Sequence, residues 1–279
     1  MDKTDIFEIL NENLGKEKCF FCLSRPRRFG KSVTAQMICS YYARCQDSSS
    51  LFDNLKIASF DDYKKHLNQY DVIFINMTDE FNDSSCDVNK MIASITKSVV
   101  GELKEAYPQI DFKSLDILHK TLKEVFSQSK VPFVIVIDEW DCIMREKKED
   151  PDSLKQYLEW LKAIFKDKPY VGLAYMTGIL PIKKYGSHSA LNMFAEYSMT
   201  EPLNLGQYIG FTENEVKEIC KQHDVAFNQM QQWYDGYSFK DVPHIYNPNS
   251  VVNAATYKKY ISYWTKTETF ESLQEYIDM

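Results

Sequence analysis

The sequence of 279 residues predicts an α/β fold with a mostly parallel central sheet, helices on both faces of that sheet and a C-terminal helical appendage. Strand-like and helix-like segments alternate along most of the chain, which is the order typical of parallel sheets. The strand-like segments are apolar at successive positions, as in strands that are buried on both faces. The seven cysteines are scattered through the chain, so a small disulfide-based fold is excluded.

The composition is that of an ordinary globular protein. Hydrophobic residues make up 44% of the chain and charged residues 26%, which excludes disorder as the main state. The net charge of −7 argues against a globally basic nucleic-acid binder. No apolar run approaches the roughly 18 residues that span a bilayer, so we expect no membrane segment. The polar, acidic N-terminus lacks the features of a secretory signal, so we expect a cytoplasmic protein.

Four segments are predicted as strands from their apolar character, and a fifth segment is a candidate strand. They are residues 18–23, 71–76, 132–137, 171–176 and a candidate fifth strand at 197–203. Helix-like segments, several with apolar residues at three- and four-residue spacing, lie between the strands. We expect helices at residues 31–44, 88–106, 115–129 and 154–165. The charged stretch 144–152 predicts a solvated surface loop.

The character of the sequence changes near residue 210. Thr212 and Glu215 have the spacing of a capping box, which marks the start of a helix. Helical patterns and Trp/Tyr-rich turns then continue to the C-terminus with no strong strand. We therefore expect a core domain at residues 1–209 and a lid-like helical appendage at residues 210–279.

A Gly-Lys-Ser tripeptide at residues 30–32 lies between the first strand and the first helix. The tripeptide alone is weak evidence, but strand, loop, tripeptide and helix in this order are what a phosphate-binding P-loop requires. Gly30 lets the backbone approach phosphate oxygens, Lys31 brings positive charge to the β- and γ-phosphates, and Ser32 offers a hydroxyl to Mg²⁺. We expect the Lys31 side chain to be solvent-accessible in the absence of ligand. The expected nucleotide-binding residues are Arg28, Phe29, Gly30, Lys31, Ser32 and Val33.

The loop departs from the usual GxxxxGK[ST] pattern at its first glycine. That glycine would fall at position 25, which is arginine here. An ordinary basic turn before a helix would explain the loop equally well, but it would predict nothing further along the chain.

A second element of a nucleotide site follows about 100 residues later. Four apolar strand residues precede Asp138 and Glu139, which is a Walker B pattern. A strand that ends beside the P-loop would place Asp138 to hold Mg²⁺ together with Ser32. Glu139 would then orient and deprotonate the attacking water.

A third element is a polar residue at the end of the next strand. Thr177 precedes Gly178 there, and we expect its hydroxyl to contact the γ-phosphate. Lys183 and Lys184 follow, and we expect them to face solvent. Together the three elements predict a P-loop NTPase fold of the AAA-like, Asp-Glu type that binds ATP and Mg²⁺.

Several sequence strings together resemble the bacterial AAA-ATPase-like family. They are Asp-Lys-Thr at residues 2–4, Arg-Pro-Arg-Arg-Phe-Gly-Lys-Ser at 25–32, Ile-Asp-Glu-Trp-Asp at 137–141, Met-Thr-Gly-Ile-Leu at 176–180, Trp-Tyr-Asp-Gly-Tyr at 233–237 and Tyr-Asn-Pro at 246–248. The resemblance runs in order from the first residues nearly to the last. Arg25 belongs to the family's own pattern, so it does not argue for an inactive site.

The resemblance implies a P-loop ATPase module of largely unestablished biological role, commonly followed by a PD-(D/E)XK nuclease domain. By position, Lys31 and Ser32 take the phosphate and Mg²⁺ roles, and Asp138 and Glu139 take the Walker B roles. We interpret the strings at 233–237 and 246–248 as fixed turns packed by aromatic residues. We expect the nuclease domain to be absent, and residues 268–279 to form a short amphipathic helix that supports self-association.

Two functions remain open at this stage. The first is slow Mg²⁺-dependent ATP hydrolysis coupled to a conformational change in the appendage. The second is a nucleotide-controlled binding module with negligible hydrolysis, whose ATP-bound state recruits a protein partner. Glu139 favours hydrolysis, but none of the candidate arginine fingers, Arg27, Arg28 and Arg145, stands out.

A nuclease or nucleic-acid-binding function is a weaker third alternative. The acid-x-Lys triplets at 102–104 and 215–217 fall on predicted helices, whereas the nuclease motif needs a strand. The CxxC pair, Cys19 and Cys22, lies on a predicted strand, where residues three apart point to opposite faces. A metal or redox role for these thiols is therefore not expected.

Overall fold

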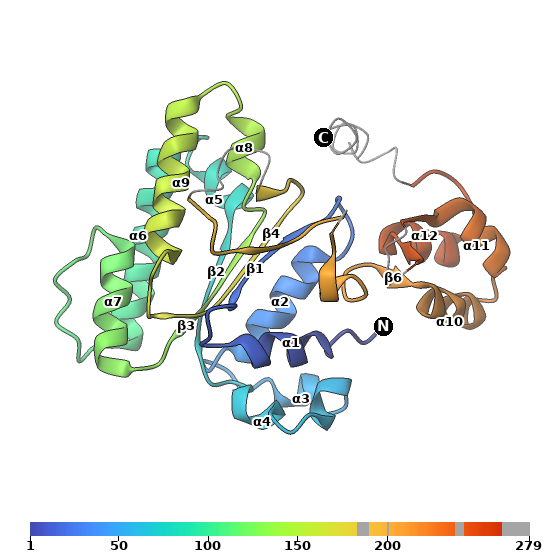
Figure 1. Ribbon diagram of the computed structural model, residues 1–279, viewed down its shortest axis with the longest axis horizontal. Helices are drawn as coiled ribbons and strands as arrows, with labels where there is room; N and C mark the ends of the chain where they lie inside the picture. The colour runs from blue at the N-terminus through green and yellow to red at the C-terminus, as the bar shows by residue number, and fades with distance from the viewer. Residues whose placement is uncertain (183–189, 200, 238–242, 264–279) are drawn as a thin grey trace.

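The computed structural model describes residues 1–182, 190–199, 201–237 and 243–263, and it confirms the predicted α/β class. A five-stranded, all-parallel sheet runs in the order β2-β3-β4-β1-β5 (Figure 1). Its strands are β1 (Phe20–Ser24), β2 (Asp71–Asn76), β3 (Phe133–Asp138), β4 (Val171–Gly178) and β5 (Ala195–Tyr197).

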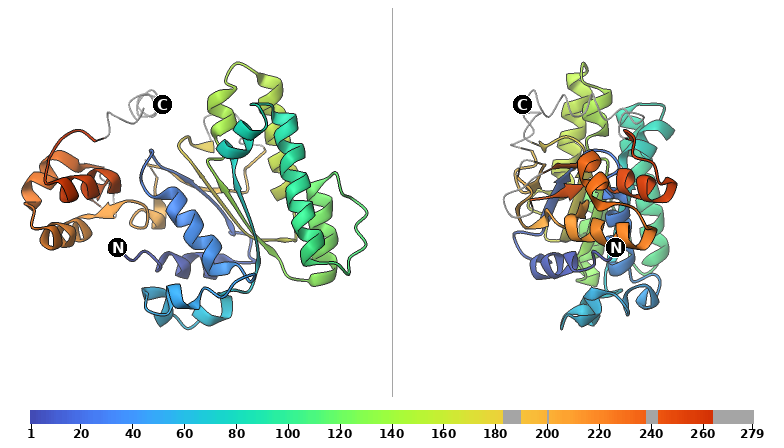
Figure 2. Two further views of the ribbon diagram at one scale, coloured as in Figure 1. Left: turned by 180° about the vertical axis from the view of Figure 1, so that it is seen from behind. Right: turned by 90° about the vertical axis from the view of Figure 1, so that its right-hand side faces the viewer.

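Helices cover both faces of this sheet (Figures 1 and 2). On one side lie α1 (Ile6–Asn13), α2 (Lys31–Tyr42), α3 (Ser49–Phe52) and α4 (Tyr63–His66), with the 3₁₀ helix η1 (Lys56–Ser59). On the other side lie α6 (Val88–Ala106), α7 (Leu118–Ser129) and α9 (Pro151–Phe165). Two short helices, α5 (Met77–Asp83) and α8 (Cys142–Glu146), follow the ends of β2 and β3.

Because every strand pair is parallel, the C-terminal ends of the strands meet at one edge of the sheet. Ser24 at the end of β1 pairs with Gly178 at the end of β4, and Asn76 pairs with Asp138 at the ends of β2 and β3. In open α/β sheets this edge is where ligands bind. The phosphate loop, the Walker B acids and Thr177 all lie at this edge.

The predicted fifth strand at 197–203 is wrong in position. The observed β5 ends at Tyr197, and the chain then turns, with the Ser198 amide donating to the Glu201 carbonyl. Pro202 follows and precedes the 3₁₀ helix η4 (Leu203–Leu205). Proline has no amide hydrogen to donate to a sheet ladder, so Pro202 counts against a strand that runs through residues 197–203.

The predicted surface loop at 144–152 is also wrong over most of its length. Residues up to Glu146 belong to α8, and Met144 is fully buried. Asp150 caps the N-terminus of α9, where its side chain accepts a hydrogen bond from the Ser153 amide, and Pro151 occupies the first turn. Asp at the N-cap and Pro just inside a helix are both favourable, so the charged stretch marks a helix boundary.

The residues after Gly210 form a C-terminal unit with its own hydrophobic cluster. Its helices are α10 (Glu213–His223), α11 (Phe227–Tyr234) and α12 (Pro248–Tyr257). The predicted capping box is present, because Thr212 and Glu215 exchange hydrogen bonds at the start of α10. The unit also contains a three-stranded sheet of order β6-β8-β7, which the sequence did not predict: β6 (Phe211–Thr212), β7 (Asp235–Tyr237) and β8 (Ile245–Tyr246). Strands of two or three residues are too short to show an alternating pattern.

The two aromatic strings of the C-terminal unit make structural contacts. The Tyr234 hydroxyl donates a hydrogen bond to the Ile261 carbonyl, and the Tyr246 side chain is fully buried in the cluster. Asn247 accepts a hydrogen bond from the Ser250 amide as the N-cap of α12, and Pro248 occupies the first turn of that helix. These contacts support a structural role for both strings, but the prediction of turns is wrong. The first string ends α11 and forms β7, and the second ends β8 and begins α12.

Candidate functional site

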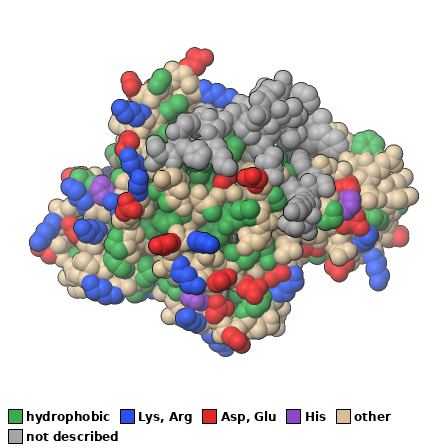
Figure 3. All heavy atoms as spheres, viewed as in Figure 1, with side chains coloured by type: hydrophobic (Ala, Val, Ile, Leu, Met, Phe, Trp, Pro, Cys, Tyr) green, Lys and Arg blue, Asp and Glu red, His purple; other side chains and the backbone are tan. Residues whose placement is uncertain are grey.

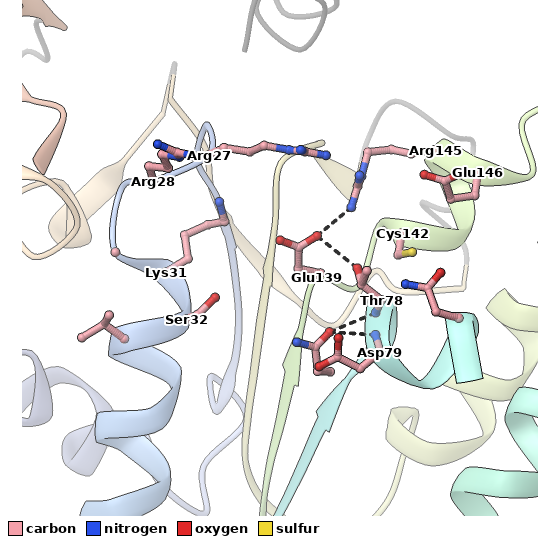
Figure 4. A pocket seen from close by; sticks show the side chains of 14 residues that line it. Arg27, Arg28, Lys31, Ser32, Thr78, Asp79, Glu139, Cys142, Arg145 and Glu146 are labelled. Atoms are coloured by element: carbon pink, nitrogen blue, oxygen red, sulfur yellow. Dashed lines mark hydrogen bonds and ion pairs between the residues drawn. The ribbon is translucent and has the colours of Figure 1, made fainter. Parts of the chain in front are cut away.

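A cavity of about 880 Å³ opens at the C-terminal edge of the sheet (Figure 4). One wall is the phosphate loop with the start of α2, and the opposite wall is built by the ends of β2 and β3 with α5 and α8. The cavity is lined by Arg27, Arg28, Gly30, Lys31, Ser32, Val33, Asn76, Thr78, Asp79, Asn82, Glu139, Cys142, Arg145 and Glu146. We call these two sides the loop wall and the acidic wall.

The loop wall has the backbone geometry of a helix N-terminus. Gly30 is the N-cap of α2 and has a φ of 90°, a left-handed conformation that favours glycine. Ser32 and Val33 in the first turn are exposed, and both line the cavity. The free amides at the start of a helix, together with the helix dipole, favour a bound anion at this place.

Lys31 differs from the prediction that its side chain is solvent-accessible. It is only 6% exposed, and its Nζ donates hydrogen bonds to the carbonyl oxygens of Arg25 and Pro26 at 2.9 and 3.0 Å. Burial lowers the pKa of Lys31 to about 8, although the nearby acids, Glu139 foremost, oppose this shift. The ammonium group therefore lies folded over its own loop and is held by neutral carbonyl groups.

Arg25, at the position of the usual first glycine, anchors the loop. Its side chain is fully buried, and its Nη1 donates to the carbonyl oxygens of Ser24 and Tyr197, both at 3.0 Å. Tyr197 ends β5, so the guanidinium connects the start of the phosphate loop to the edge strand of the sheet. A large buried side chain fixes the start of the loop here, where other P-loops have a flexible glycine.

Phe29 is also buried, and its side chain does not line the cavity. Gly210, with a φ of 106°, lies against it, because a Cβ placed on this glycine would come within 3.3 Å of the Phe29 ring. Only the backbone of Phe29 is therefore available to a nucleotide. Arg28, by contrast, is exposed and lines the cavity.

The Walker B residues diverge at the end of β3, as their sequence order predicts. Asp138 is 1% exposed and accepts hydrogen bonds from the Thr177 hydroxyl and the Glu139 amide. Glu139 has a φ of 54° and lines the cavity. A non-glycine residue in this conformation is uncommon and occurs at sites where the surrounding structure enforces it.

Thr177 occupies a different place from the one we expected. It is fully buried and does not line the cavity, and its hydroxyl donates to Asp138. Its carbonyl also accepts the Trp140 amide at 2.9 Å. This geometry favours a role in orienting Asp138 over direct contact with the γ-phosphate.

Glu139 is held by two donors from the acidic wall (Figure 4). Its Oε2 accepts a hydrogen bond from the Thr78 hydroxyl at 3.2 Å. The same atom forms an ion pair with Arg145 Nη2 at 2.8 Å. Arg145 Nε also lies 3.4 Å from Asp141 Oδ2. Burial lowers the pKa of Arg145, but the two carboxylates outweigh it and raise that pKa overall, so the side chain stays charged.

Asp141 is a site residue that we did not single out from the sequence. It is fully buried, and its Oδ2 accepts hydrogen bonds from the amides of Ile179 and Leu180 at 3.1 and 2.9 Å. Burial raises the pKa of Asp141, whereas Arg145 and the two amides lower it. Asp141 thus joins the chain after β4 to α8. A third acid after a strand end was visible in the sequence, but no spacing rule distinguishes such a buried anchor from a surface acid.

The polar residues after β2 form the rest of the acidic wall, and sequence reasoning missed them as well. Asn76 ends β2 and caps α5, since its side chain accepts hydrogen bonds from the amides of Thr78 and Asp79. The available signal was a polar run, Asn-Met-Thr-Asp, directly after an apolar strand. Polar residues at the ends of adjacent parallel strands converge on the same edge.

The donor set at this edge fits Mg²⁺. The cation prefers oxygen ligands and often takes only one or two carboxylates together with substrate phosphates. Ser32 is exposed at the start of α2 and lines the cavity, whereas the Asp138 carboxylate is 1% exposed, does not line the cavity and is held in one orientation by Thr177. Across the described ranges no group of three or more His, Cys, Asp or Glu residues could hold a metal by itself. A metal at this edge would therefore depend on nucleotide oxygens for part of its coordination.

The alternative sites receive no support from the structure. Burial raises the pKa of Cys19 to about 11 and that of Cys22 well above its usual value, so both thiols stay protonated. The triplets at 102–104 and 215–217 lie on α6 and α10, as predicted, and not on strands. Lysines and acids are interspersed among the described side chains on the face shown in Figure 3. Lys183, Lys184 and the tail at 268–279 lie outside the described residues.

The all-parallel sheet, the glycine-capped helix after β1 and the acids at the end of β3 define a P-loop nucleotide-binding module. A family model described as "Predicted AAA-ATPase" matches residues 1–187. The chain therefore belongs to the AAA-ATPase-like family.

Similar proteins are distant in sequence. An "Uncharacterized protein in vnfD 5'region" of Azotobacter chroococcum mcd 1 is 21% identical over 255 residues, covering 89% of this chain and 47% of that protein. The chain thus spans about half the length of this curated relative.

Among solved structures, the Aeropyrum pernix ORC2 protein in ADPNP-ADP complexes is 10% identical and has a TM-score of 0.42. The match covers 79% of this chain and 50% of that chain. Drosophila ORC bound to AT-rich DNA and Cdc6 is 13% identical and has a TM-score of 0.32. The match covers 99% of this chain and 83% of that chain. Both scores are below 0.5, so no property of either protein is transferred to this chain. Within the described part of the chain, no helix combines the length and apolarity needed to cross a bilayer.

Proposed function

We propose that this chain binds ATP in the cavity between the loop wall and the acidic wall and hydrolyses it slowly with the help of Mg²⁺. The observation that carries the proposal is the shared cavity. Lys31 and Ser32 line it from one side and Glu139 lines it from the other, although more than 100 residues separate them in the sequence. A phosphate-binding loop opposite a carboxylate is the arrangement that phosphoryl transfer to water requires.

Binding would change the contacts of the loop wall. The amides at the start of α2 would donate to the β-phosphate, and Lys31 would exchange the carbonyls of Arg25 and Pro26 for phosphate oxygens. This exchange is favourable because the ammonium group replaces neutral carbonyl acceptors by ionised phosphate oxygens, which adds the attraction between opposite charges. Ser32 and Asp138 would hold Mg²⁺, which neutralises charge on the β- and γ-phosphate oxygens when it is bound.

Glu139 would act in the hydrolytic step. The oxygen of a water forms a bond to the γ-phosphorus while the bond from that phosphorus to the bridging oxygen breaks, and ADP leaves with the electron pair. Glu139 accepts the proton from the water, so the products are ADP and inorganic phosphate. Thr177 acts indirectly in this proposal, because it fixes the carboxylate of Asp138.

Contacts between the C-terminal unit and the loop wall support a coupling between them. The Asn247 side-chain amide donates to the Arg27 carbonyl at 3.4 Å, and Gly210 packs against Phe29. Lys3 forms an ion pair with Glu215 at 2.5 Å, which connects the N-terminus to the same unit. A loop that rearranges on nucleotide binding would shift these contacts. We therefore propose that nucleotide state is coupled to the position of the C-terminal unit.

One observation favours the alternative of a nucleotide-controlled binding module with negligible hydrolysis. Glu139 Oε2 is already occupied by Thr78 and Arg145. Oε2 therefore contacts a water in the cavity only after one of these partners moves. In that alternative the ATP-bound state recruits a partner, either another protein or a second copy through the C-terminal region.

Phosphate release by purified protein separates the two functions. The hydrolytic proposal expects slow Mg²⁺-dependent release that Glu139→Gln removes while ATP binding is kept. The alternative expects ATP binding with no release above that of Glu139→Gln. Failure to bind ATP would contradict both.

A further inference from the structure

We propose that Arg145 is the residue by which this site distinguishes a nucleoside triphosphate from a diphosphate. In this view its guanidinium moves from Glu139 to the γ-phosphate and thereby frees Glu139. The inference rests on the proposed function, because it assigns a role within the same site.

The position of Arg145 singles it out among the basic side chains of the cavity. Those side chains are Arg27, Arg28, Lys31 and Arg145. Arg28 and Lys31 stay on the loop wall, whereas Arg145 comes from α8 on the opposite side, beside Glu139 (Figure 4). The Arg27 side chain starts from the phosphate loop but extends across the cavity toward the acidic wall in the same view. Arg145 is the basic side chain that contacts the carboxylate opposite the loop, where we expect the γ-phosphate to project when the loop holds the β-phosphate.

Asp141 provides a fixed anchor for this movement. Arg145 Nε lies 3.4 Å from the buried Asp141 carboxylate, whereas its Nη2 contacts Glu139 at the cavity surface. A guanidinium carries five N–H donors in a planar fork, so one edge can stay with a carboxylate while another edge contacts a phosphate. Asp141 itself accepts hydrogen bonds from the amides of Ile179 and Leu180, so it stays in place when Arg145 moves. A small rotation of the side chain changes the partner of Nη2.

The exposure of the three groups fits the same exchange. The side chain of Asp141 is 0% exposed, that of Arg145 15% and that of Glu139 29%. The chain of contacts thus runs from the protein interior to the cavity, with the exchangeable ion pair at its open end. A phosphate brings more negative charge than a single carboxylate, so it competes for Nη2 in a way that water does not.

The exchange links recognition of the triphosphate to the release of Glu139 from Arg145. With ADP bound, no γ-phosphate competes, and Arg145 and Thr78 both remain on Glu139 Oε2. With ATP bound, Arg145 leaves Oε2 and the carboxylate loses its ion pair. Glu139 is therefore free of Arg145 only when there is a γ-phosphate to transfer.

The test is the ratio of two affinities, measured by titrating the protein with Mg²⁺ and either ADP or a non-hydrolysable ATP analogue. Arg145→Gln keeps a donor near Asp141 but removes the charge. We expect this variant to bind the analogue at least about tenfold more weakly, the range for losing a hydrogen bond to a charged group. Its affinity for ADP should change by less than about threefold. Lys147→Gln is the matched control, because it removes one positive charge just after α8 from a side chain that lies over the Phe81 ring, and both affinities should stay unchanged.

Other outcomes would overturn the inference in distinguishable ways. Equal loss of both affinities, with a lowered melting temperature, would make Arg145 a structural residue. Unchanged affinities with faster phosphate release would make it a lock on Glu139 that never contacts phosphate. If wild-type protein binds neither nucleotide, the proposed function itself fails. If it binds both and only the ratio is insensitive to Arg145→Gln, the proposed function stands and this inference alone is wrong.

Discussion

The loop wall and the acidic wall hold their charged groups by different physical means. On the loop wall, the Lys31 ammonium is buried against two neutral backbone carbonyls of its own loop. On the acidic wall, Glu139 is held by a charged partner, Arg145, which is in turn paired with Asp141. Both reactive groups therefore rest in contacts with their own wall.

This difference determines how each wall can respond to a ligand. Carbonyl groups of a loop are replaced by phosphate oxygens with a gain in charge-assisted bonding, so the loop wall is suited to binding. A network of side-chain ion pairs has alternative partners, so the acidic wall is suited to switching. Substitutions on each wall separate these two roles.

Asp141→Ala should destabilise the acidic wall. It leaves Arg145 without its buried partner and the amides of Ile179 and Leu180 without an acceptor. Removing one partner of a buried ion pair costs about 3–5 kcal/mol, so the free energy of unfolding should fall by about that amount. Denaturant unfolding measures it, with Glu149→Ala in the exposed loop before α9 as the control. A loss below about 1 kcal/mol would mean that Asp141 is not an anchor.

Glu139→Gln should separate binding from hydrolysis. The amide keeps the size of the side chain but cannot take a proton from water, so phosphate release should fall by about 10²-fold or more. ATP affinity should change by less than about threefold. Single-turnover phosphate release and nucleotide titration measure the two quantities. If release continues at the wild-type rate, another group is the base and the acidic wall has been assigned the wrong role.

Lys31 should give the loop wall a pH-dependent stability in the absence of nucleotide and metal. Its pKa is lowered to about 8 in the folded protein, below the value of 10.5 for an unperturbed lysine. Between these values the unfolded chain binds more protons, so the free energy of unfolding should rise with pH by about 1 kcal/mol per unit. Below pH 8 Lys31 is charged in both the folded and the unfolded protein, so it adds no pH dependence to the free energy of unfolding. Denaturation of wild type and Lys31→Met from pH 7 to 10 checks the sign. The same slope in both proteins would contradict the buried position of the ammonium group.

Asn247→Ser should have the smallest effect. Serine keeps an acceptor for the N-cap of α12 but removes the amide donor to the Arg27 carbonyl. We expect stability to change by less than about 1 kcal/mol and nucleotide affinity by less than about threefold. Limited proteolysis of the C-terminal unit should, however, respond less to ATP than in wild type. An unaltered ATP response would place the coupling elsewhere.

Much of the loop wall was predictable because its signals are local. The order of apolar strand, Gly-Lys-Ser and helix is contiguous in the sequence, and Gly30 adopts the left-handed conformation that its residue type allows. Part of what the sequence did not show there is long-range. The contact of Arg25 with Tyr197 joins residues 172 positions apart. The hydrogen bonds of Lys31 to the Arg25 and Pro26 carbonyls are local, but the residue types alone do not indicate them.

The acidic wall was only half predictable. Asp138 and Glu139 follow a strongly apolar strand, so their place at the edge of the sheet follows from the strand itself. The partners of Glu139 cannot be derived from the pattern of that strand. Thr78 comes from the neighbouring strand end, and Arg145 belongs to a stretch that charge alone assigned to a solvated loop. Net charge in a short stretch does not indicate which of its side chains turn inward.

The central claim is that ATP binds between these two walls with Lys31 at its phosphates. Equilibrium titration with Mg²⁺ and a non-hydrolysable ATP analogue tests it most directly, comparing wild type with Lys31→Ala and with Lys18→Ala. Lys18 is exposed just before β1, at the opposite edge of the sheet. The account predicts saturable binding to wild type and to Lys18→Ala, and affinity at least about tenfold weaker for Lys31→Ala, in keeping with the loss of a charge-assisted contact. Equal affinity in all three proteins would contradict it.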